Sequence, residues 1–387
     1  MKKKRRFGRR VFCVLIVLFM GVIWQSDLLS QEPAEVRSLR KQEILQTDDN
    51  YREYYFGLLT EDEKKIYREM LSGIQERQDE FYLTSSNEQL ISKVYHALLK
   101  DHPELFWVHN REEVYTTAYK GTDYCRFSPG YTYTDQEIQE IMAFMEHALE
   151  EVKEQITQDM SAYDKVKTVY TYLIDHAEYE ASGDDQNIAG IFWKKKAVCA
   201  GYARAVQYLL EQLGVPCIYV EGNARNGDEG HAWNIVFLDG DWYYIDPTWG
   251  DASYQREEGE ETPTLTETVN YDYFCVTTQE IERTHSMDDN QLLPVCNAVQ
   301  DQYYRHEGLY LQSADKEKID EIFARAAQKG APMVCFQCAD DTVYQEVYRL
   351  LIEEQGIFAY LPESETTAAY LDSDRERTFY FWFTEVS

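Results

Sequence analysis

Hydrophobic residues recur along the first part of the chain at the spacing of amphipathic helices. Three of these runs open with a capping-box pattern, in which Thr60, Ser85 or Thr134 is followed three residues later by glutamate. Each pattern predicts a helix that starts after that residue. The second helix is predicted to end before Pro103, because proline lacks the amide hydrogen that a helix interior requires and restricts the residue before it.

Aromatic and β-branched residues replace the helical pattern over Leu105–Tyr119 and Tyr124–Tyr133. Residues of these types, in two runs separated by a glycine-containing break, predict two strands. Together with the three helices, these strands predict a small mixed α/β module over residues 50–158.

The C-terminal part of the chain alternates between helical and strand patterns in the same way. This alternation predicts a small α+β or ferredoxin-like domain over residues 291–387. Its expected elements are a strand at Leu309–Gln312, a helix at Asp315–Gln328, a strand at Met333–Cys338, a helix at Asp341–Glu354 and strands near the end of the chain.

The central part of the chain combines two helical patterns with a series of strand patterns. One helix is predicted over Ser161–His176, and a second begins at Cys199 and is closed by Gly214 as its C-terminal cap. Residues 215–220 then predict a strand, and two further strand patterns lie on either side of Asp239-Gly240. The fold class that these elements predict is α+β.

The dipeptide Asp239-Gly240 is a strong signal for a two-residue hairpin turn, and such a turn determines the pairing of the strands around it. With that turn, Trp233 faces Asp246. Because side chains alternate between the two faces of a strand, His231 points to the same side as Trp233 and Asp246. His231 and Asp246 are then diagonal neighbours, roughly 7–8 Å apart between backbones, which lets the carboxylate reach the imidazole.

Charge adds a new feature at the N-terminus. Seven of the 38 lysine and arginine residues lie in the first ten positions, and an apolar run from Val11 to Trp24 follows them. As a helix, the sixteen uncharged residues before Asp27 would span roughly 24 Å, which is short for a membrane span, but no small-x-small cleavage triplet follows the run. We interpret residues 1–30 as a signal peptide or signal anchor, and favour an uncleaved single anchor with an exported body. Residues 31–49 form a polar stalk.

The remainder of the chain is strongly acidic. The formal net charge is −31, and the chain after its first ten residues carries 31 basic against 69 acidic side chains. Such a body repels nucleic acid, so no nucleic-acid partner is expected. The sequence contains no phosphate-binding loop, dinucleotide fingerprint or paired metal-ligand spacing, so neither a cofactor nor a metal ion is expected.

The eight cysteines are too few for a disulfide framework in a chain of 387 residues. Cys335 and Cys338 have the spacing of a redox pair. They lie in a predicted strand, however, where their side chains would point to opposite faces. We therefore expect two unrelated structural cysteines at these positions.

Cys199 has a different setting, because it stands at the start of a predicted helix. Unpaired amides and the helix dipole favour a thiolate there and can stabilise an oxyanion. A lone cysteine is more often a buried structural residue. Here it is followed by His231 at the start of a strand and by Asp246 on the partner strand, which supplies a nucleophile, a base and an orienting acid. We therefore predict a Cys199-His231-Asp246 catalytic triad. The Cys199 amide is the first candidate oxyanion donor, and the second is open between Gln186, Trp193 and a nearby tyrosine.

At these residues the sequence resembles the transglutaminase-like superfamily, in its bacterial exported branch. The resemblance covers about Ser161 to Asp251 and implies a papain-related α+β core over residues 159–290. It implies Cys199 as nucleophile, His231 as general base and acid, and Asp246 as orienting group. Asn270–Phe274 also resembles the additional strand that such bacterial proteins carry after the core. The segments that carry the resemblance are Val198-Cys199-Ala200-Gly201-Tyr202-Ala203, Gly230-His231-Ala232-Trp233-Asn234, Trp242-Tyr243 and Ile245-Asp246-Pro247-Thr248-Trp249-Gly250-Asp251.

The resemblance does not determine the reaction, because the family contains protein cross-linkers, cysteine proteases, deglycosylating amidases and inactive forms. We expect an extracytoplasmic enzyme that acts on protein or peptide amides at the cell surface, by acyl transfer or by hydrolysis. Such an enzyme would be held by a single membrane anchor, or secreted if the N-terminal segment is cleaved. Two alternatives stay open: a cysteine protease of the same fold, and a catalytically silent cell-surface scaffold or adhesion module.

Overall fold

A computed structural model of the chain describes residues 53–109, 113–119, 122–181, 183, 186–224, 229–251, 269–287, 292–331, 333–361 and 367–384. Backbone contacts divide the chain into two compact units, with the boundary between Glu140 and Ile141. The basic and apolar N-terminal segment and the polar stalk lie outside the described residues. Among the helices of the described ranges, none has the length and apolar character needed to cross a membrane.

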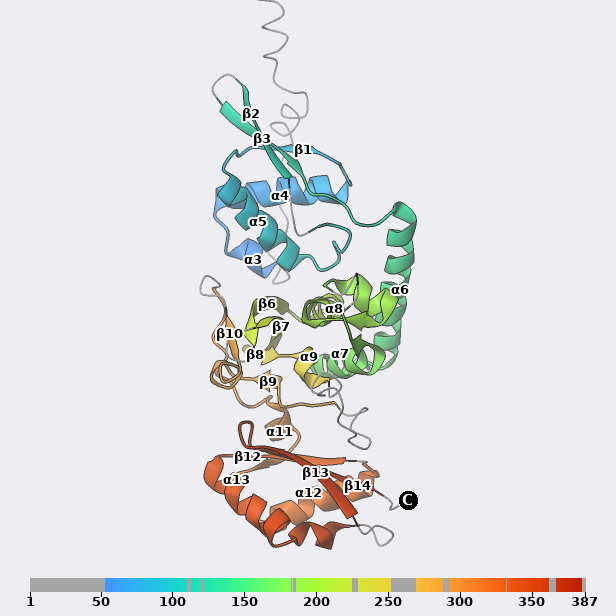
Figure 1. Cartoon of the computed structure of the whole chain (residues 1–387), viewed down its shortest axis with the longest axis vertical. Helices are drawn as coiled ribbons and strands as arrows, with labels where there is room; N and C mark the ends of the chain where they lie inside the picture. Colours follow the sequence, from blue (N-terminus) through green and yellow to red (C-terminus); the bar gives the residue numbers. More distant parts are fainter. Residues whose placement is uncertain are drawn as a thin grey trace, which may run out of the picture. The chain divides into compact units, whose positions relative to one another are not determined.

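The first unit combines helices with a three-stranded antiparallel sheet of order β1-β3-β2 (Figure 1). Rings from helix and sheet form its core, where Phe127 contacts both Phe81 and Tyr95. The predicted mixed module is therefore confirmed as a fold. Its elements are α3 (Tyr54–Gly57), α4 (Glu61–Gln75), β1 (Phe81–Leu83), α5 (Glu88–Asp101), β2 (Glu113–Tyr119) and β3 (Thr122–Ser128), and α6 (Asp135–Glu154) begins in this unit and continues into the second.

Two of the three predicted capping boxes in this region are present. The Thr60 side chain accepts the Glu63 amide at the start of α4, and Thr134 and Glu137 bond reciprocally at the start of α6. At the start of α5 the prediction is wrong, because the Asn87 carboxamide caps the helix by accepting the Leu90 amide at 3.2 Å. The Ser85 hydroxyl accepts the Asn87 amide instead, which shifts the helix start by two residues.

The strands of this unit are shorter than or displaced from the predicted ones. The strand expected over Leu105–Tyr119 is confirmed only over β2, and residues 105–107 belong to a buried turn after α5. The strand expected over Tyr124–Tyr133 is found at β3, two residues earlier, and it ends at Ser128. Apolar composition alone does not distinguish a buried turn from a buried strand, which accounts for the first difference.

The second unit begins with a five-stranded antiparallel sheet of order β10-β6-β7-β8-β9, against which α8 packs (Figure 1). This is the α+β core that the sequence predicts. Its elements are α7 (Ala162–His176), β4 (Glu178–Tyr179), the π-helical turn η1 (Gly190–Lys194), β5 (Lys196–Ala197), α8 (Cys199–Gln212), β6 (Cys217–Ala224), β7 (Glu229–Leu238), β8 (Asp241–Ile245), α9 (Pro247–Gly250), β9 (Phe274–Val276), α10 (Thr278–Ile281) and β10 (His285–Met287).

The β7–β8 hairpin has the predicted register, with Leu238 opposite Asp241 and Asn234 opposite Ile245. Asp239 and Gly240 have positive φ angles of 49° and 106°, as a type I′ turn requires. A shift of this register by one residue would move every side chain of β8 to the other face of the sheet. The turn therefore determines which residues face α8.

Helix α8 begins and ends as the sequence predicts. Its first residue is Cys199, and Gly214 follows its end with a φ of +77°. The Val215 amide bonds the Leu210 carbonyl and the Gly214 amide bonds the Glu211 carbonyl, which together form a Schellman motif.

The additional strand of the core lies at β9 rather than at the predicted Asn270–Phe274. Residues 271–273 form a turn, and the strand starts at Phe274. Cys275 has a positive φ of 58°, and the pairing of β9 with β8 is irregular between Tyr244 and Ile245. This bulge places the turn, and not the strand, beside the end of β8.

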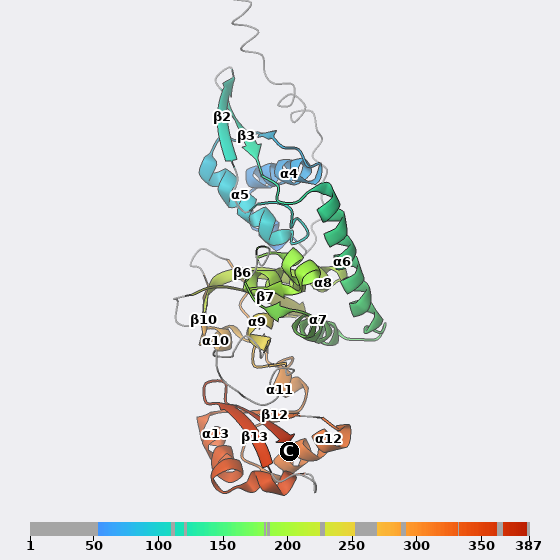
Figure 2. The ribbon, with the colours of Figure 1, turned by 45° about the vertical axis from the view of Figure 1, so that its right-hand side comes forward.

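The remaining elements form a four-stranded sheet of order β11-β12-β14-β13, with α12 and α13 on one of its faces (Figure 2). Because β11 and β12 are parallel neighbours, the order is not that of a ferredoxin-like sheet, and only the α+β alternative is confirmed. The elements are α11 (Tyr303–His306), β11 (Tyr310–Leu311), α12 (Lys316–Lys329), β12 (Met333–Cys338), α13 (Asp341–Tyr348), η4 (Arg349–Glu353), η5 (Gly356–Tyr360), β13 (Thr367–Ser373) and β14 (Thr378–Thr384).

Cys335 and Cys338 lie on opposite faces of β12, as predicted. Cys338 belongs to the hydrophobic cluster beneath α12 and α13, whereas Cys335 packs on the other face with Tyr304 and Tyr380. Both thiols are free and buried. Despite their spacing, the two cysteines therefore do not form a redox pair.

A buried carboxylate joins this sheet to the turn before β9. Asp272 accepts hydrogen bonds from the hydroxyls of Tyr304 at 2.6 Å, Tyr380 at 2.8 Å and Thr378 at 3.1 Å. Burial raises the pKa of Asp272 to about 6, although these donors act in the opposite direction. The turn that precedes β9 is thus held in place by residues later in the chain, two of which, Thr378 and Tyr380, lie more than a hundred positions away.

Candidate active site

Cys199 is held at the first position of α8, with its side chain half-buried. The preceding residue, Val198, is extended and has no side-chain acceptor for the first amides of the helix. Helix-start amides that lack such a cap are free to bind a negatively charged atom. The thiol therefore lies beside a group of oriented donors.

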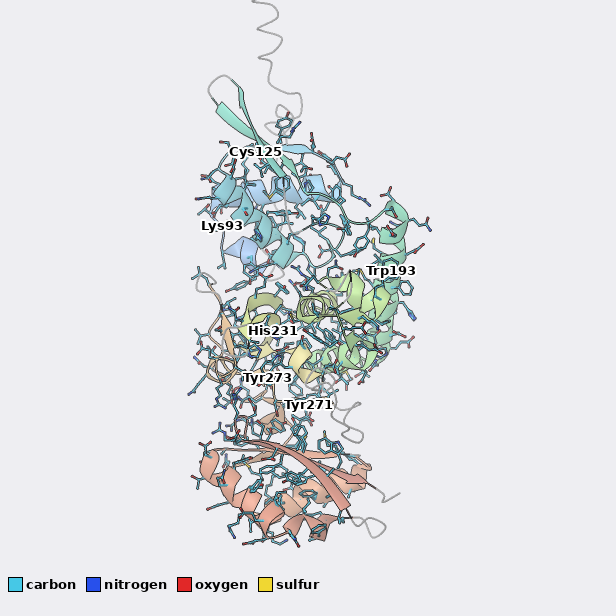
Figure 3. The ribbon with its side chains drawn as sticks, in the orientation of Figure 1. Lys93, Cys125, Trp193, His231, Tyr271 and Tyr273 are labelled. Atoms are coloured by element: carbon cyan, nitrogen blue, oxygen red, sulfur yellow. The ribbon has the colours of Figure 1, made fainter. Side chains whose placement is uncertain are left out.

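His231 and Asp246 lie on neighbouring strands, as the hairpin register predicts. His231 Nε2 is 2.8 Å from Asp246 Oδ2, and both side chains are buried. Figure 3 shows His231 toward the middle of the second unit's sheet and helices. The diagonal relation between the two residues is thus confirmed as a direct hydrogen bond.

The position of Asp246 follows from its second role as the N-cap of α9. Its Oδ1 accepts the backbone amides of Thr248 at 2.9 Å and Trp249 at 3.2 Å, and Pro247 occupies the first helical position. These two bonds fix the rotation of the carboxylate. Oδ2 is consequently directed at the histidine.

The backbone around Asp246 is held by Tyr170 of α7. The Tyr170 hydroxyl donates to the carbonyl oxygens of Asp246 and Asn270, both at 3.0 Å. A Cβ at Gly250 would lie 2.0 Å from this hydroxyl, so only glycine allows the close approach. The Asp246 amide in turn donates to the Tyr273 carbonyl at 3.0 Å.

The electrostatics of the site favour a charged imidazole. Burial opposes this charge, but Asp246 and a hydrogen bond with Cys199 raise the pKa of His231 well above its usual range. Burial likewise opposes the charge of Asp246, whose pKa is nevertheless held far below normal by His231 and His285. The structure thus pairs His231 with Asp246 by a direct hydrogen bond, and Cys199 interacts with the imidazole, while the catalytic role of the three residues stays a prediction.

The candidates for a second oxyanion donor differ in their settings. Gln186 lies in an exposed turn, and Trp193 lies in η1 with the Lys194 ammonium 3.3 Å from its ring centroid. Figure 3 shows Trp193 toward the α6 side of the core, away from His231. Tyr219 packs beside Cys199, but its hydroxyl donates to Glu221. The Cys199 amide stays the first candidate.

One residue of the site was not predicted from the sequence. His285, the first residue of β10, lies with its Nε2 3.1 Å from Asp246 Oδ2 and is buried. It follows Asp246 by 39 positions and belongs to no recognisable motif. The available signal was a histidine in a short strand pattern after the core, which is too common to be informative.

One potential ligand atom from each of His231, Asp246 and His285 lies within 4.8 Å of the others, a spacing that a metal ion could bridge. Each contact to Asp246, however, has the length of a direct hydrogen bond, and the carboxylate already receives two backbone amides. Aromatic rings surround the group, with the centroids of Trp249 and Trp233 4.7 and 4.9 Å from that of His285. The contacts therefore fit a hydrogen-bond network better than a metal centre with open positions.

Comparison with known protein families gives a match over the same segment. Residues 150–247 match the model of the transglutaminase-like superfamily, and this range contains Cys199, His231 and Asp246. The central core of the chain is transglutaminase-like. His285 lies outside the matched range.

Two curated proteins share sequence with part of the chain. Kyphoscoliosis peptidase of Mus musculus is 29% identical over 117 residues, which cover 26% of this chain and 18% of the relative. Its Homo sapiens counterpart is 27% identical over 105 residues, or 23% of this chain and 16% of the relative. The chain thus spans less than a fifth of the length of these relatives.

Solved structures with a similar fold match part of the chain. A structure described as a TGase is 17% identical, with a TM-score of 0.28, over 40% of this chain and 48% of its own. The periplasmic domain of TgpA from Pseudomonas aeruginosa is 16% identical, with a TM-score of 0.21, over 33% of this chain and 55% of its own.

Proposed function

We propose that the protein is a cysteine enzyme that transfers or hydrolyses acyl groups of protein or peptide amides. The observation that carries the proposal is the buried hydrogen bond between His231 and Asp246, with Cys199 at the start of α8 interacting with the imidazole. A nucleophile, an imidazole and an orienting carboxylate in this order are the requirements for covalent acyl transfer.

In the first half of the reaction, the Cys199 sulfur attacks the amide carbon of the substrate. A carbon–sulfur bond forms, and the carbon–nitrogen bond breaks after the charged His231 gives its proton to the leaving nitrogen. In the second half, water or an amine attacks the thioester and gives a proton to His231. Cys199 then leaves as the thiolate, and an acid or a new amide is released.

The carbonyl oxygen becomes negative in both halves of this reaction. Amides at the start of α8 are suited to hold that charge, because Val198 provides no side-chain cap for them. Donors of this kind contribute about a hundredfold to a thousandfold to the rate. Cys199 would thus supply both the nucleophile and one oxyanion donor.

Asp246 orients His231 rather than exchanging protons with it. Its Oδ1 is occupied by the amides of Thr248 and Trp249, so Oδ2 is available to the imidazole. The low pKa of Asp246 keeps it ionised at neutral pH, where His231 is charged. The carboxylate therefore favours the imidazolium that the first half of the reaction needs.

An extracytoplasmic location is part of the proposal. It rests on the basic and apolar pattern of residues 1–30 and on the acidic body that follows. The substrate would then be a protein or peptide at the cell surface, with the body held by an anchor or released after cleavage. Antibody or protease access to the body on intact cells would test this location.

The reaction is tested by following ammonia release from a glutamine-containing peptide, with and without an added primary amine. The wild type should release ammonia, and Cys199→Ala should not, because the thioester cannot form. Cys217→Ala is the matched control, since that thiol is free and buried. Ammonia release by Cys199→Ala at the wild-type rate would refute the proposal.

A cysteine protease is the second candidate, favoured by the peptidase name of the curated relatives. The same assay separates the two reactions by the fate of the acyl group. Incorporation of the added amine into the peptide identifies transfer, whereas cleavage of the peptide chain that the amine does not divert identifies proteolysis. A catalytically silent scaffold would give neither product.

A further inference from the structure

The Asp246 carboxylate is shared by two histidines rather than one. His285 Nε2 lies 3.1 Å from Oδ2, the same oxygen that His231 Nε2 contacts at 2.8 Å. The side chains of His285 and Asp246 are fully buried, so water does not compete for these bonds. A triad of three residues therefore does not account for all the polar contacts of the carboxylate.

The positions of the protons follow from the number of donors around Asp246. An ionised carboxylate can only accept hydrogen bonds, and Oδ1 already accepts two backbone amides. Both histidines must therefore carry a proton on Nε2 and donate it to Oδ2. The Nδ1 atom of His231 is then the ring nitrogen left for Cys199, which also raises the pKa of this imidazole.

Thr284 determines how the other side of the His285 ring is satisfied. Its Oγ1 lies 2.8 Å from His285 Nδ1 and 3.4 Å from the Ile281 carbonyl. With a neutral ring, the hydroxyl donates to Nδ1 and Nε2 keeps its proton for Asp246. The contact is thus compatible with the tautomer that the bond to the carboxylate requires.

The pairing of β10 with β6 positions the His285 ring beside Asp246. β10 pairs with β6 so that Met287 lies opposite Gly222, and a Cβ at Gly222 would be 2.2 Å from the Ser286 carbonyl oxygen. The absence of a side chain allows the edge strand to lie close. The rings of Trp249, Trp233 and Tyr273 then surround His285, with centroids 4.7, 4.9 and 5.7 Å away.

We infer that His285 is a positioning residue that fixes Asp246 Oδ2 and keeps it ionised, and thereby sets the tautomer and charge of His231. The inference rests on the proposed function of the triad and deepens it. An aromatic slot of this kind would accept an apolar side chain, so a purely structural role does not explain the polar ring. The bond to Asp246 does.

The test replaces His285 by leucine, which removes the donor, and by glutamine, whose terminal amide can occupy the place of Nε2–H. The readout is the rate of Cys199 alkylation by iodoacetamide between pH 4 and pH 9. In His285→Leu we expect the rate at neutral pH to fall about 10- to 100-fold, the effect of a hydrogen bond to a charged group. The pH at which the alkylation rate falls on the acid side, the acid limb of the profile, should rise by about one unit, because Asp246 then holds the imidazolium less firmly.

His285→Gln should restore most of the rate and return the acid limb toward its wild-type position, even if both variants unfold at the same lower temperature. A structural role alone would change thermal stability without moving the pH profile. Equal profiles for wild type and His285→Leu would overturn the inference, as would a profile for His285→Gln identical to that of His285→Leu. If wild-type Cys199 itself reacts no faster than a free thiol, the proposed function fails instead, and the inference fails with it.

Thr284→Val provides an independent variant, because it removes the contact to His285 Nδ1 and leaves the ring in place. We expect a smaller shift of the acid limb in the same direction. A shift in the opposite direction would contradict the assignment of the tautomer.

Discussion

Replacement of Asp246 by asparagine probes the hydrogen-bond network with almost no change in shape. The carboxamide oxygen must take the place of Oδ1, because only an oxygen can accept the amides of Thr248 and Trp249. Its NH₂ group then faces the two Nε2 atoms of His231 and His285. Both rings would have to present a lone pair there, so His231 would carry its proton on Nδ1, toward Cys199.

The expected loss of rate in Asp246→Asn has two causes. Removal of a charge in direct contact should lower the pKa of His231 by about one to three units. This shifts the equilibrium between the imidazolium–thiolate pair and the neutral pair with Cys199 by about tenfold to a thousandfold toward the neutral pair. Reversal of the tautomer adds a further cost, since the ring nitrogen at Cys199 no longer accepts a proton. We therefore expect alkylation and turnover to fall by about 10²- to 10⁴-fold in Asp246→Asn, a loss of the order known for the orienting aspartate of serine proteases.

The assay is peptide-level mass spectrometry of Cys199 after timed exposure to iodoacetamide at pH 7, with thermal unfolding measured in parallel. Asp301→Asn is the matched control, because Asp301 is also buried and also contacts a histidine, with Oδ1 3.1 Å from His306 Nδ1. The control should alkylate at the wild-type rate. Equal rates for Asp246→Asn and wild type would refute the assignment of Asp246 as the orienting group.

Three further predictions concern the support of the site. Since burial raises the pKa of Asp272 to about 6 in the folded protein, this group destabilises the fold as the pH rises through the range from 4 to 7. Asp272→Asn keeps acceptors for Tyr304 and Tyr380 and does not titrate. In urea unfolding, the free energy of unfolding of the variant minus that of wild type should therefore increase by about 2–3 kcal/mol between pH 4 and pH 7. A difference that stays constant with pH would contradict this. Gly250→Ala should lower stability by about 1–3 kcal/mol and slow alkylation, because the new methyl group displaces the Tyr170 hydroxyl from its two carbonyls, and unchanged thermal unfolding would contradict it. Treatment with EDTA should leave the activity unchanged, whereas a loss that zinc restores would mean that the cluster of two histidines and an aspartate binds a metal.

The positions of Cys199, His231 and Asp246 were predictable because each depends on the sequence of the helix or hairpin in which it lies. The Asp239-Gly240 turn admits essentially one register, and that register alone brings His231 and Asp246 to one face. The start of α8 was equally predictable, since a long helix-forming run begins at Cys199. In both cases the signal lies within about fifteen residues of chain.

The part that was not predicted depends on contacts between distant segments. His285 reaches Asp246 only because β10 pairs with the edge of β6, and no feature near residue 285 specifies that partner. The start of β9 was displaced because Cys275 adopts a positive φ that its residue type does not suggest. At the start of α5, two residues with similar capping ability lie close together, and Asn87 rather than Ser85 caps the helix.

The arrangement of the C-terminal strands was open for a related reason. The order of helix and strand patterns along the chain is compatible with several strand orders in the sheet. These orders differ in whether β11 lies directly beside β12, as it does here, or is separated from it by another strand. That choice is made by burial of Phe336, Phe379 and Phe381 beneath the helices, which is a property of the assembled domain. Sequence patterns predict which helices and strands form better than they predict which strands lie side by side.

The central claim, that Cys199 is activated by His231, is tested most directly by the alkylation of Cys199 in wild type and in His231→Ala. The other cysteines of the described residues are buried, so peptide-level mass spectrometry should find fast labelling at Cys199 alone. We predict that wild-type Cys199 reacts with iodoacetamide at pH 6 much faster than a free thiol, and that His231→Ala abolishes this advantage. Wild-type labelling no faster than that of a free thiol, or fast labelling that His231→Ala leaves unchanged, would contradict the account and favour a catalytically silent module.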